Sequence, residues 1–539
     1  MFSEADEYFN FFRTTTQSLL DSAPIDVGVS HTKISILKHA QAFQEKLMLF
    51  SPKTQFVLRG GDLLTPKTVT ISPVTEFDVS ETIRPLALSS YIYFNFKRNN
   101  FEGLLEYTVD NNTETYRAAE ITEQINKYIP TNIVRMEGSA AENMVVVQSD
   151  SDYKKLYVYK YFWQGNEKIQ SSWMTFSFAK DIRSFYFIES TLYVITTDSI
   201  GTYIETIPME NGLVESDKNY ALLLDHRLPG SSTLLTFLGW YVSSTVNING
   251  QNISNATEIG TQSGFKFQTG MSLYTKNGNK RELIIDNTDD TRAVVKGLIA
   301  DFVSYGGSLV YNGDIKYICT DTHTSDAAKK PGEGADWQNF WRVITTTQAA
   351  NAWSSGQSYT EEVLYVCTRG HVSTDANKPP SSPEWGLAGS FAASAPLWNE
   401  GYEYLDSDDF FIGFEYDMLY RFSKQNLKQP TERGGRSASD YTFQTIRNGS
   451  IEYADTGHFT VEVTPKFRDK YTYTYNPSLL ASVSTLSKFT PETGFFKFAV
   501  QAQPNDATIE IKSSSALPVK LLAAEFESTI ISRSRRYGG

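Results

Sequence analysis

Most of the chain alternates between apolar and polar residues in short runs that turn-forming residues separate. The clearest stretch is residues 144–207, where the strand-like segments are MVVVQ, KKLYVYKYFW, KIQSSWMTF, SFYFIES, TLYVITT and TYIETI. Because successive short strands joined by tight turns form antiparallel meanders, this stretch predicts sheets like those of a propeller blade or a barrel. Residues 31–108 show the same pattern.

Other segments vary this pattern. Residues 118–129 (AAEITEQINKYI) favour a short helix that ends before Pro130. Residues 232–254 alternate again, and Asn249-Gly250 is a hairpin turn signal. Strand patterns return after residue 440 and predict a β-sandwich. The expected fold is all-β with little helix.

Composition limits the classes of function. The 539 residues are enough for three or four domains. The formal charge of −13 argues against a protein that coats nucleic acid or anionic lipid, because both bind to surfaces rich in Lys and Arg. Two cysteines exclude a disulfide framework and indicate synthesis in the cytoplasm. No run of 18 apolar residues predicts a transmembrane helix. The motifs GxSxG, HExxH, GxGxxG and the P-loop are absent, so we expect no enzyme, cofactor or metal.

An internal repeat is the sharpest feature of the sequence. A shift of 48 residues places Tyr311, Tyr317, Cys319, Thr320, His323, Ser325, Ala328, Lys330, Pro331 and Trp337 on Tyr359, Tyr365, Cys367, Thr368, His371, Ser373, Ala376, Lys378, Pro379 and Trp385. Breaks rich in Gly, Ser and Pro flank the pair, SYGGS before it and LAGSFAASAP after it. This pattern predicts two small β-modules inserted in tandem at 301–392, and we expect residues 305–390 to be dispensable for folding.

The repeated Cys-x₃-His pairs allow two interpretations. Cys319 with His323 and Cys367 with His371 could form one Cys₂His₂ zinc site if the modules dock closely. Each thiol lies in an apolar strand pattern, however, where a free cysteine packs as a small buried residue, and we favour this interpretation. Acidic groups in turn-like contexts are expected to be solvated loops, namely Asp286, Asp289 and Asp290, and Asp406, Asp408 and Asp409.

Tryptophan is concentrated in the repeat. Four of the eight tryptophans, Trp337, Trp341, Trp353 and Trp385, fall within 49 residues. Indole faces stack on the apolar faces of sugars, so these residues, with Tyr311 and Tyr359, are candidate carbohydrate-binding residues. The alternative is that the tryptophans form the small cores of the modules. Both roles stay open, and Trp337 and Trp385 are the two that the repeat makes equivalent.

Outside the repeat, a set of longer segments carries a family resemblance. These segments are EYFNFF, DSAPIDVGVSHTKISILKHAQAFQEKLMLFS, TQFVLRGGDLLTPKTVTISPVTEFDV, ETIRPLALSSYIYF, YIPTNIVRMEGSAAEN, QSSWMTFSFAKDIRSF, FFIGFEYDMLYRFSKQNLKQ and SRSRRYGG, and they span about 1–210 and 393–539. Through them the chain resembles the tail tubular protein B family, the nozzle proteins of short-tailed bacteriophages. The repeat resembles chitin-binding type-3 carbohydrate-binding modules.

The resemblance implies a subunit that contains a β-propeller, assembles as a hexameric ring below the portal and adaptor, and conducts DNA. Family members carry a further N-terminal part that this chain would then lack, by a split gene or truncation. The expected domains are a propeller-like β-domain at 1–210, a nozzle-type β-region at 211–300, the modules at 301–392 and a C-terminal β-sandwich or platform domain at 393–539.

The expected function is therefore a structural subunit of a virion tail, made in the cytoplasm of the host bacterium. Expected partners are further copies, the tail adaptor or gatekeeper protein, the tail fibres, DNA in transit without tight binding, and a host surface glycan. The alternatives are a tail-associated glycan-binding adhesin and a glycan hydrolase. No catalytic acid motif supports the hydrolase.

Overall fold

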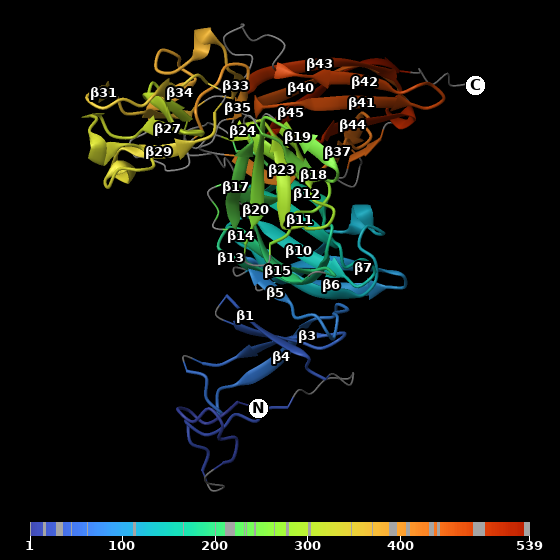
Figure 1. Cartoon of the computed structure of the whole chain (residues 1–539). Coiled ribbons are helices and arrows are strands. Elements are labelled where there is room, and N and C mark those ends of the chain that lie inside the picture. The colour runs from blue at the N-terminus through green and yellow to red at the C-terminus, as the bar shows by residue number, and fades with distance from the viewer. Residues whose placement is uncertain are drawn as a thin grey trace. The chain divides into compact units, whose positions relative to one another are not determined.

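The protein is all-β, as expected from the sequence (Figure 1). The computed structural model describes residues 2–13, 18–28, 36–44, 46–61, 63–110, 115–164, 167–199, 201–210, 221–230, 232, 234–241, 244–262, 265–275, 280–299, 303–346, 348–368, 370–387, 396–405, 410–430, 436–438, 442–477 and 491–532. Within these ranges the only helices are short 3₁₀ turns. The chain divides into two compact units, Met1–Asn211 and Gly212–Gly539.

The described part of the first unit contains four antiparallel sheets, and each joins strands that follow one another in the sequence. The first sheet contains β1 (His39–Phe43), β2 (Lys46–Phe50), β3 (Gln55–Arg59) and β4 (Thr70–Thr75). The second contains β5 (Leu86–Leu88), β6 (Tyr91–Arg98), β7 (Phe101–Asp110) and β8 (Thr115–Glu120). The third contains β9 (Ile133–Ser139), β10 (Met144–Ser149), β11 (Lys155–Gln164) and β12 (Glu167–Ser177), and the fourth β13 (Asp181–Ile188), β14 (Thr191–Thr197) and β15 (Thr202–Pro208).

The inner sheets of this unit are covered on both faces. All six residues of β10 are buried, although side chains alternate between the two faces of a strand. Val145 and Val147 pack in a core with Tyr93 and Leu104 of the second sheet. The side chains between them, such as Val146, pack instead with the fourth sheet. A continuous apolar run in this strand therefore reflects two cores, one on each face.

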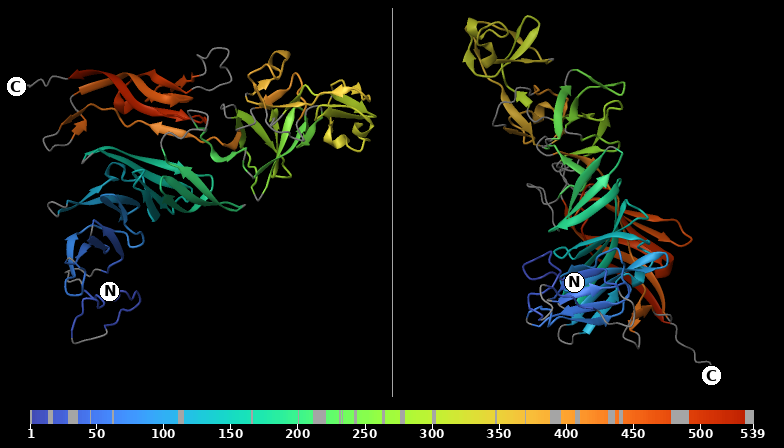
Figure 2. Two further views of the ribbon diagram at one scale, coloured as in Figure 1. Left: turned by 90° about the vertical axis from the view of Figure 1, so that its left-hand side faces the viewer. Right: turned by 90° about the horizontal axis from the view of Figure 1, so that it is seen from below.

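The same arrangement joins the first two sheets. Met48 and Phe50 of the first sheet share a core with Ile92 and Phe94 of the second. The sheets of the unit thus follow one another in order, from blue to teal in Figure 2, and each covers the next. Sequential meander sheets that stack through their faces are the unit of a β-propeller. Closure into a complete propeller stays a prediction.

The prediction of a helix at 118–129 is wrong. Residues 115–120 form β8, whose side chains alternate in burial and whose backbone pairs with β7. Only Glu123–Ile125 (η1) is helical, as a single 3₁₀ turn. Pairing with the neighbouring strand outweighs the weak local preference for a helix at this position.

The second unit begins with a seven-stranded sheet in the order β16-β36-β21-β22-β23-β20-β17. Its strands are β16 (Asp225–Pro229), β17 (Leu235–Tyr241), β20 (Ala256–Thr261), β21 (Ser272–Thr275), β22 (Lys280–Ile285), β23 (Arg292–Lys296) and β36 (Phe410–Phe414). The expected hairpin joins β18 (Val246–Ile248) to β19 (Gln251–Ile253). Asn249 and Gly250 both have positive φ, 52° and 79°, as a two-residue hairpin turn requires, so this prediction is confirmed.

The repeat region and a small hairpin supply the remaining short elements before the last domain. These are β24 (Leu298–Ile299), β25 (Val303–Tyr305), β26 (Leu309–Asn312), β27 (Ile315–Cys319), β28 (His323–Thr324), η2 (Ala327–Lys329), η3 (Trp337–Asn339), β29 (Trp341–Ile344), β30 (Asn351–Ala352), β31 (Ser358–Tyr359), β32 (Val363–Cys367), β33 (His371–Val372), η4 (Asp375–Asn377), β34 (Trp385–Leu387), β35 (Glu403–Leu405), β38 (Lys428–Pro430) and β39 (Arg436–Ala438).

Two sheets at the C-terminal end share one apolar core. One contains β37 (Met418–Arg421), β41 (Phe459–Pro465), β42 (Tyr471–Tyr475) and β44 (Ala507–Ser513), and the other β40 (Thr442–Thr456), β43 (Glu492–Ala502) and β45 (Leu521–Ser532); η7 is Pro504–Asp506. Ile451, Val461, Val500 and Ile511 meet between them. A Cβ atom on Gly449 would lie 2.3 Å from the Phe498 ring, so the close packing requires glycine. Two sheets over one core form the sandwich that the sequence predicted.

Candidate functional site

The two copies of the repeat are built around the same group of buried side chains. In the first module Cys319 pairs across the sheet with Trp341, and in the second Cys367 pairs with Trp385. The indole Nε1 of Trp341 donates to the Lys329 carbonyl at 2.9 Å, and that of Trp385 donates to the Asn377 carbonyl at 2.8 Å. The two tryptophans therefore hold equivalent positions and close the same loop.

A histidine and a tyrosine complete each core. The His323 ring lies edge-on to Trp341 with centroids 5.2 Å apart, and the His371 ring lies edge-on to Trp385 at 5.1 Å. Tyr359 packs on Trp341 in the first module. The equivalent residue of the second module is Tyr404, which packs on Trp385. Each tyrosine hydroxyl accepts a backbone N–H five residues earlier, at 2.9 Å.

The residues that occupy equivalent positions in the two modules differ from those that the repeat in the sequence indicated. The ungapped shift pairs Trp337 with Trp385 and Tyr311 with Tyr359, whereas the structure pairs Trp341 with Trp385 and Tyr359 with Tyr404. The loop from Pro331 to Trp341 spans ten positions, whereas the corresponding loop from Pro379 to Trp385 spans six. The loop of the second module is therefore shorter, and a shift without gaps cannot represent this difference. The pattern W-x₂-G-x₂-Y, which occurs at 353–359 and again at 398–404, is the sequence signal that could have revealed the correct correspondence of Tyr359 with Tyr404.

The first module is inserted within the second, whereas the sequence predicted two modules in tandem. The first strand of the second module is β25, which pairs with β32 although the whole first module lies between them in the sequence. The first module uses β26, β27 and β29 and ends with β31. Trp398 and Tyr404 then close the second module in a core with Tyr365, Cys367 and Trp385. The second module is thus interrupted by the first, and it extends past residue 392 to Leu405.

A buried ion pair joins the two modules at this interruption. Arg342 of β29 donates to both carboxylate oxygens of Glu362 at 2.7 Å, and Ser304 of β25 also donates to Glu362. The Glu362 side chain is 1% exposed. Ile318 and Ile344 of the first module pack with Leu397 of the second. Because a buried carboxylate needs its partners, the two modules form one packed body.

The candidate sugar-binding aromatic residues fall into two groups. Trp341, Trp385 and Tyr359 are buried in the module cores. Trp337 and Trp353 are half-buried, and Tyr311 is 44% exposed. Only this second group, which lies entirely in the first module, presents ring surface that a ligand could reach.

The cysteine and histidine pairs lie in two separate cores, as the buried interpretation expected. Cys319 Sγ is 3.6 Å from His323 Nδ1, and this nitrogen is 2.7 Å from the Asp321 carbonyl. Burial raises the pKa of the Cys319 thiol to about 12. Among the described residues the two pairs do not come together as one group, so the arrangement does not provide the single Cys₂His₂ site that the spacing allowed.

Asp286 and Asp289 accept hydrogen bonds from residues of the turns in which they lie. Asp286 accepts the N–H and the hydroxyl of Thr288, at 2.9 and 2.7 Å, and an N–H of Arg292. These bonds, those from Thr288 foremost, lower the pKa of Asp286 to about 2. Asp289 accepts from Thr291 in the same way. Asp406, Asp408 and Asp409 lie outside the described residues.

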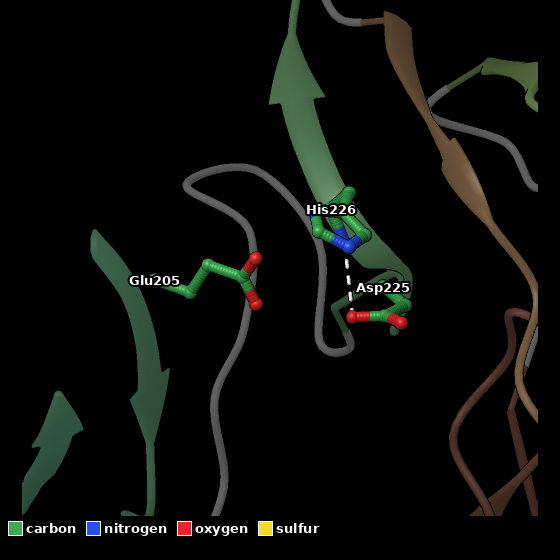
Figure 3. A group of neighbouring side chains, drawn as sticks. All are labelled: Glu205, Asp225 and His226. Carbon is green, nitrogen blue, oxygen red and sulfur yellow. Dashed lines mark hydrogen bonds between the residues drawn. The ribbon is translucent and has the colours of Figure 1, made fainter. Parts of the chain in front are cut away.

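Asp225 and His226, at the start of β16, are the acidic and histidine pair drawn in Figure 3. The dashed line is the backbone N–H of His226 donating to the Asp225 carboxylate at 3.1 Å. Glu205, the third residue drawn, belongs to the first unit, where it accepts from the Thr196 hydroxyl at 2.7 Å. Each of these two carboxylates accepts a hydrogen bond from a residue of its own unit, and we assign a catalytic role to neither.

Comparison with known proteins decides the family. A sequence model described as bacteriophage nozzle protein matches residues 1–296 and 347–537. The chain belongs to the bacteriophage nozzle family. Membership makes it a structural component of a phage tail and gives it no enzymatic role. Its resemblance to tail tubular protein B is confirmed.

The similarity to a phage relative is partial, and that to two solved structures is weak. The chain is 31% identical to tail tubular protein gp12 of Escherichia phage T7 over 230 residues, which are 42% of this chain and 29% of that protein. Hsv2p of Kluyveromyces lactis is 9% identical with a TM-score of 0.22, covering 49% of this chain and 73% of that one. PorZ of Porphyromonas gingivalis is 11% identical with a TM-score of 0.18, covering 67% and 43%. Scores this low assign no fold.

The gap in the family match falls on the repeat region. The unmatched residues 297–346 contain β26, β27 and β29 of the first module and also β25 of the second, whereas β31 of the first module and β32, β34 and β35 of the second lie in the matched part. The gap therefore covers most of the first module without following the boundary between the two modules. Among the described residues, no helix has the length and apolar character needed to cross a membrane.

Trp→Ala substitutions distinguish core residues from ligand-binding ones. We expect Trp341→Ala and Trp385→Ala each to destabilise their module by about 3–5 kcal/mol, because a large buried side chain is lost. Trp337→Ala should cost far less, because its ring is half-buried. Hydrogen exchange of the full chain measures both effects. Equal protection in Trp341→Ala and wild type would contradict the core assignment.

Deletions test the nested arrangement. Removing 306–360 and joining Tyr305 to Glu361, with Glu361→Gly, leaves β25 and β32 connected by two residues, as Gly313-Asp314 connects β26 and β27. We expect this variant to fold, since the second module keeps its whole core.

The originally expected deletion, 305–390, serves as the comparison. It removes the partners of Trp398 and Tyr404, so we expect insoluble protein. Soluble expression and thermal melting measure both variants. A folded Δ305–390 beside an insoluble Δ306–360 would refute the nesting.

The cysteine environment predicts low reactivity. Because the pKa of Cys319 is raised to about 12, little thiolate exists at pH 8, and the group is buried. We expect iodoacetamide to leave Cys319 unmodified in the native chain and to alkylate it fully in urea. Rapid native alkylation, or one equivalent of zinc retained after dialysis, would overturn the buried-thiol assignment.

Proposed function

We propose that the chain is a ring-forming subunit of a short phage tail through which DNA passes, and that the inserted module binds host glycan. The family match over 1–296 and 347–537 carries this proposal. The stacked meander sheets of the first unit support it, because they have the propeller-like organisation that the resemblance implies. A hexamer, with the adaptor and the tail fibres as neighbours, is part of the proposal, as is synthesis in the host cytoplasm.

The charge of the chain favours passage of DNA over retention. Phosphate contacts by Lys and Arg release counterions and hold duplex DNA strongly. The chain carries 62 acidic residues against 49 basic ones. A path lined with net negative charge would let the duplex slide without such contacts.

The glycan-binding role rests on the first module. Trp337 and Trp353 leave part of their rings accessible, and the Lys330 ammonium lies 6.0 Å from the Trp353 ring. A sugar stacked on one ring gains mainly apolar burial, so a single site binds weakly. Repetition around a ring would raise the effective concentration and make weak sites useful at a cell surface.

Assembly and DNA binding can be measured on one preparation. We expect negative-stain images of the chain, expressed with the other tail proteins of its phage, to show rings with a central channel. The same preparation should bind linear duplex DNA only weakly at physiological salt. Persistent monomers would count against the ring, and tight DNA binding would count against the acidic path.

The glycan role has a separate measurement. We expect the full chain to be retained on insoluble chitin or peptidoglycan, and the double variant Trp337→Ala/Trp353→Ala to elute early while it stays folded, with melting lowered far less than in Trp341→Ala. Phe162→Ala, which changes an exposed aromatic residue of the first unit, is the matched control. Equal retention of all three proteins would eliminate these rings as the binding surface.

A further inference from the structure

A lysine is buried between two carboxylates at one end of the fourth sheet of the first unit. The side chain of Lys180 is 6% exposed, and its ammonium lies 3.5 Å from a carboxylate oxygen of Glu205 and 3.8 Å from one of Asp198. The side chains of Asp198 and Glu205 are 22% and 17% exposed. We call these three residues the lysine triad.

The strand register brings the members of the triad together. β13 and β14 are antiparallel, and their ladder pairs Asp181 with Thr197 at its end. Lys180 and Asp198 are the next residues along the two segments, so they lie opposite each other. Glu205 comes from β15, which pairs along the other side of β14. Three neighbouring segments therefore each contribute one member.

Further contacts hold each member of the triad in place. Asp198 accepts the Gly201 N–H at 2.9 Å, and Glu205 accepts the Thr196 hydroxyl at 2.7 Å. The lysine ammonium lies 3.7 Å from the centre of the Tyr203 ring, which covers one side of it. The fold therefore keeps an amine beside two carboxyl groups with little freedom to move. Such fixed proximity gives reactions within one molecule a high effective concentration.

The contacts of the Lys180 ammonium are long for a buried charge. A hydrogen bond between an ammonium and a carboxylate is typically about 2.7–2.9 Å long, whereas Lys180 donates to Glu205 at 3.5 Å. Lys168 shows the contrast, because its ammonium lies 2.6 and 2.7 Å from the two oxygens of Glu106 and donates to the Tyr159 hydroxyl at 3.0 Å. A buried charge without close partners lowers the stability of a fold. A change that makes the Lys180 nitrogen neutral would therefore be favourable.

We propose that Lys180 and Asp198 join in an amide bond within the chain, with Glu205 carrying the protons. The Lys180 ammonium gives one proton to the Glu205 carboxylate, and the neutral amine attacks the carboxyl carbon of Asp198. Glu205 passes this proton to an oxygen of Asp198, takes a second proton from the nitrogen and delivers it to the same oxygen. That oxygen leaves as water, so one C–N bond forms, one C–O bond breaks and Glu205 ends as a carboxylate.

The reaction is balanced within the triad. The ammonium loses two hydrogens and the carboxylate loses one oxygen, which together make one water molecule, and no electron is transferred. The reaction occurs once in each chain, so it adds no enzymatic activity. Its product replaces a buried ion pair with a neutral amide, and it ties the segment before β13 to the turn after β14. A covalent tie of this kind stabilises a protein mainly by restricting its unfolded chain.

The intact mass of the full chain tests the bond directly. We expect the purified chain, denatured in acid, to weigh one water molecule less than its sequence. Trypsin does not cleave after an acylated lysine, so digestion should give residues 169–183 joined to residues 184–218 as one branched peptide. Because the bond lies within one chain, the result does not depend on whether chains assemble into rings.

Two results would overturn the proposal. One is an intact mass equal to that of the sequence, with normal cleavage after Lys180. The other is a chain that lacks one water but is still cleaved after Lys180. That loss would place a succinimide at Asp198-Ser199, formed by the backbone, in place of the bond to lysine.

Substitutions separate the bond from the ion pair. Lys180→Arg keeps the positive charge but removes the primary amine, and Glu205→Gln keeps the size of the side chain but removes the base. We expect both variants to have the full mass of their own sequences and to give only linear peptides. Lys168→Arg is the matched control, since it changes a lysine paired with a carboxylate outside the triad, and it should still lack one water.

The variant results also decide the role of each residue. A branched peptide in Glu205→Gln at the yield of wild type would contradict the proton transfer assigned to Glu205. Loss of water that persists in Lys180→Arg would overturn the bond itself. The mass of the wild-type chain is measured after denaturation, so the proposal stays testable even where a variant fails to fold.

Discussion

An antiparallel sheet with apolar residues on both faces must be covered twice, and this constraint organises the first unit. Met144, Val146 and Val158 belong to one core, while Val145, Val147 and Tyr157 belong to another, although all lie on β10 and β11. The second and third sheets therefore each need a neighbour on either side. Sequential sheets provide that cover, because each meander follows the last along the chain. A shift of one residue in strand register would exchange the two cores.

In the second unit, the constraint is the buried carboxylate of Glu362. Arg342 from the first module and Ser304 from the second both bond it, so this carboxylate ties the two modules together at their junction. Gln348 adds a second connection by donating to the Trp398 carbonyl at 2.7 Å. These contacts give the pair of modules a fixed geometry, and any ligand bound to one is held in a defined orientation relative to the other.

The sequence predicted what depends on local pattern and missed what depends on distant pairing. Strand alternation identified β10 to β15, and Asn249-Gly250 identified its hairpin, because both signals lie within a few residues. The helix expected at 118–129 failed because β7 offered Ala118 and Ala119 a strand partner.

The candidate site shows the same limit. The sequence located the repeat and its aromatic residues, but an ungapped shift could not reveal that Trp341 is the counterpart of Trp385. Nor could it show that β25 pairs across the whole first module with β32, or that Arg342 meets Glu362. These pairings depend on contacts between residues that are far apart in the sequence and carry no local signature.

The position of the first module explains how the fold accommodates it. It lies in the connection between β25 and β32, which are adjacent antiparallel strands, so the ends that it joins are close together. Its own ends are close as well, since Ser308 N–H donates to the Thr360 carbonyl at 3.0 Å and Thr360 N–H to the Ser308 hydroxyl at 2.9 Å. An insert with adjacent ends, placed at a hairpin turn, leaves the surrounding strands where they were. The chain can therefore continue on both sides of this module, which adds aromatic surface without altering the strands that support it.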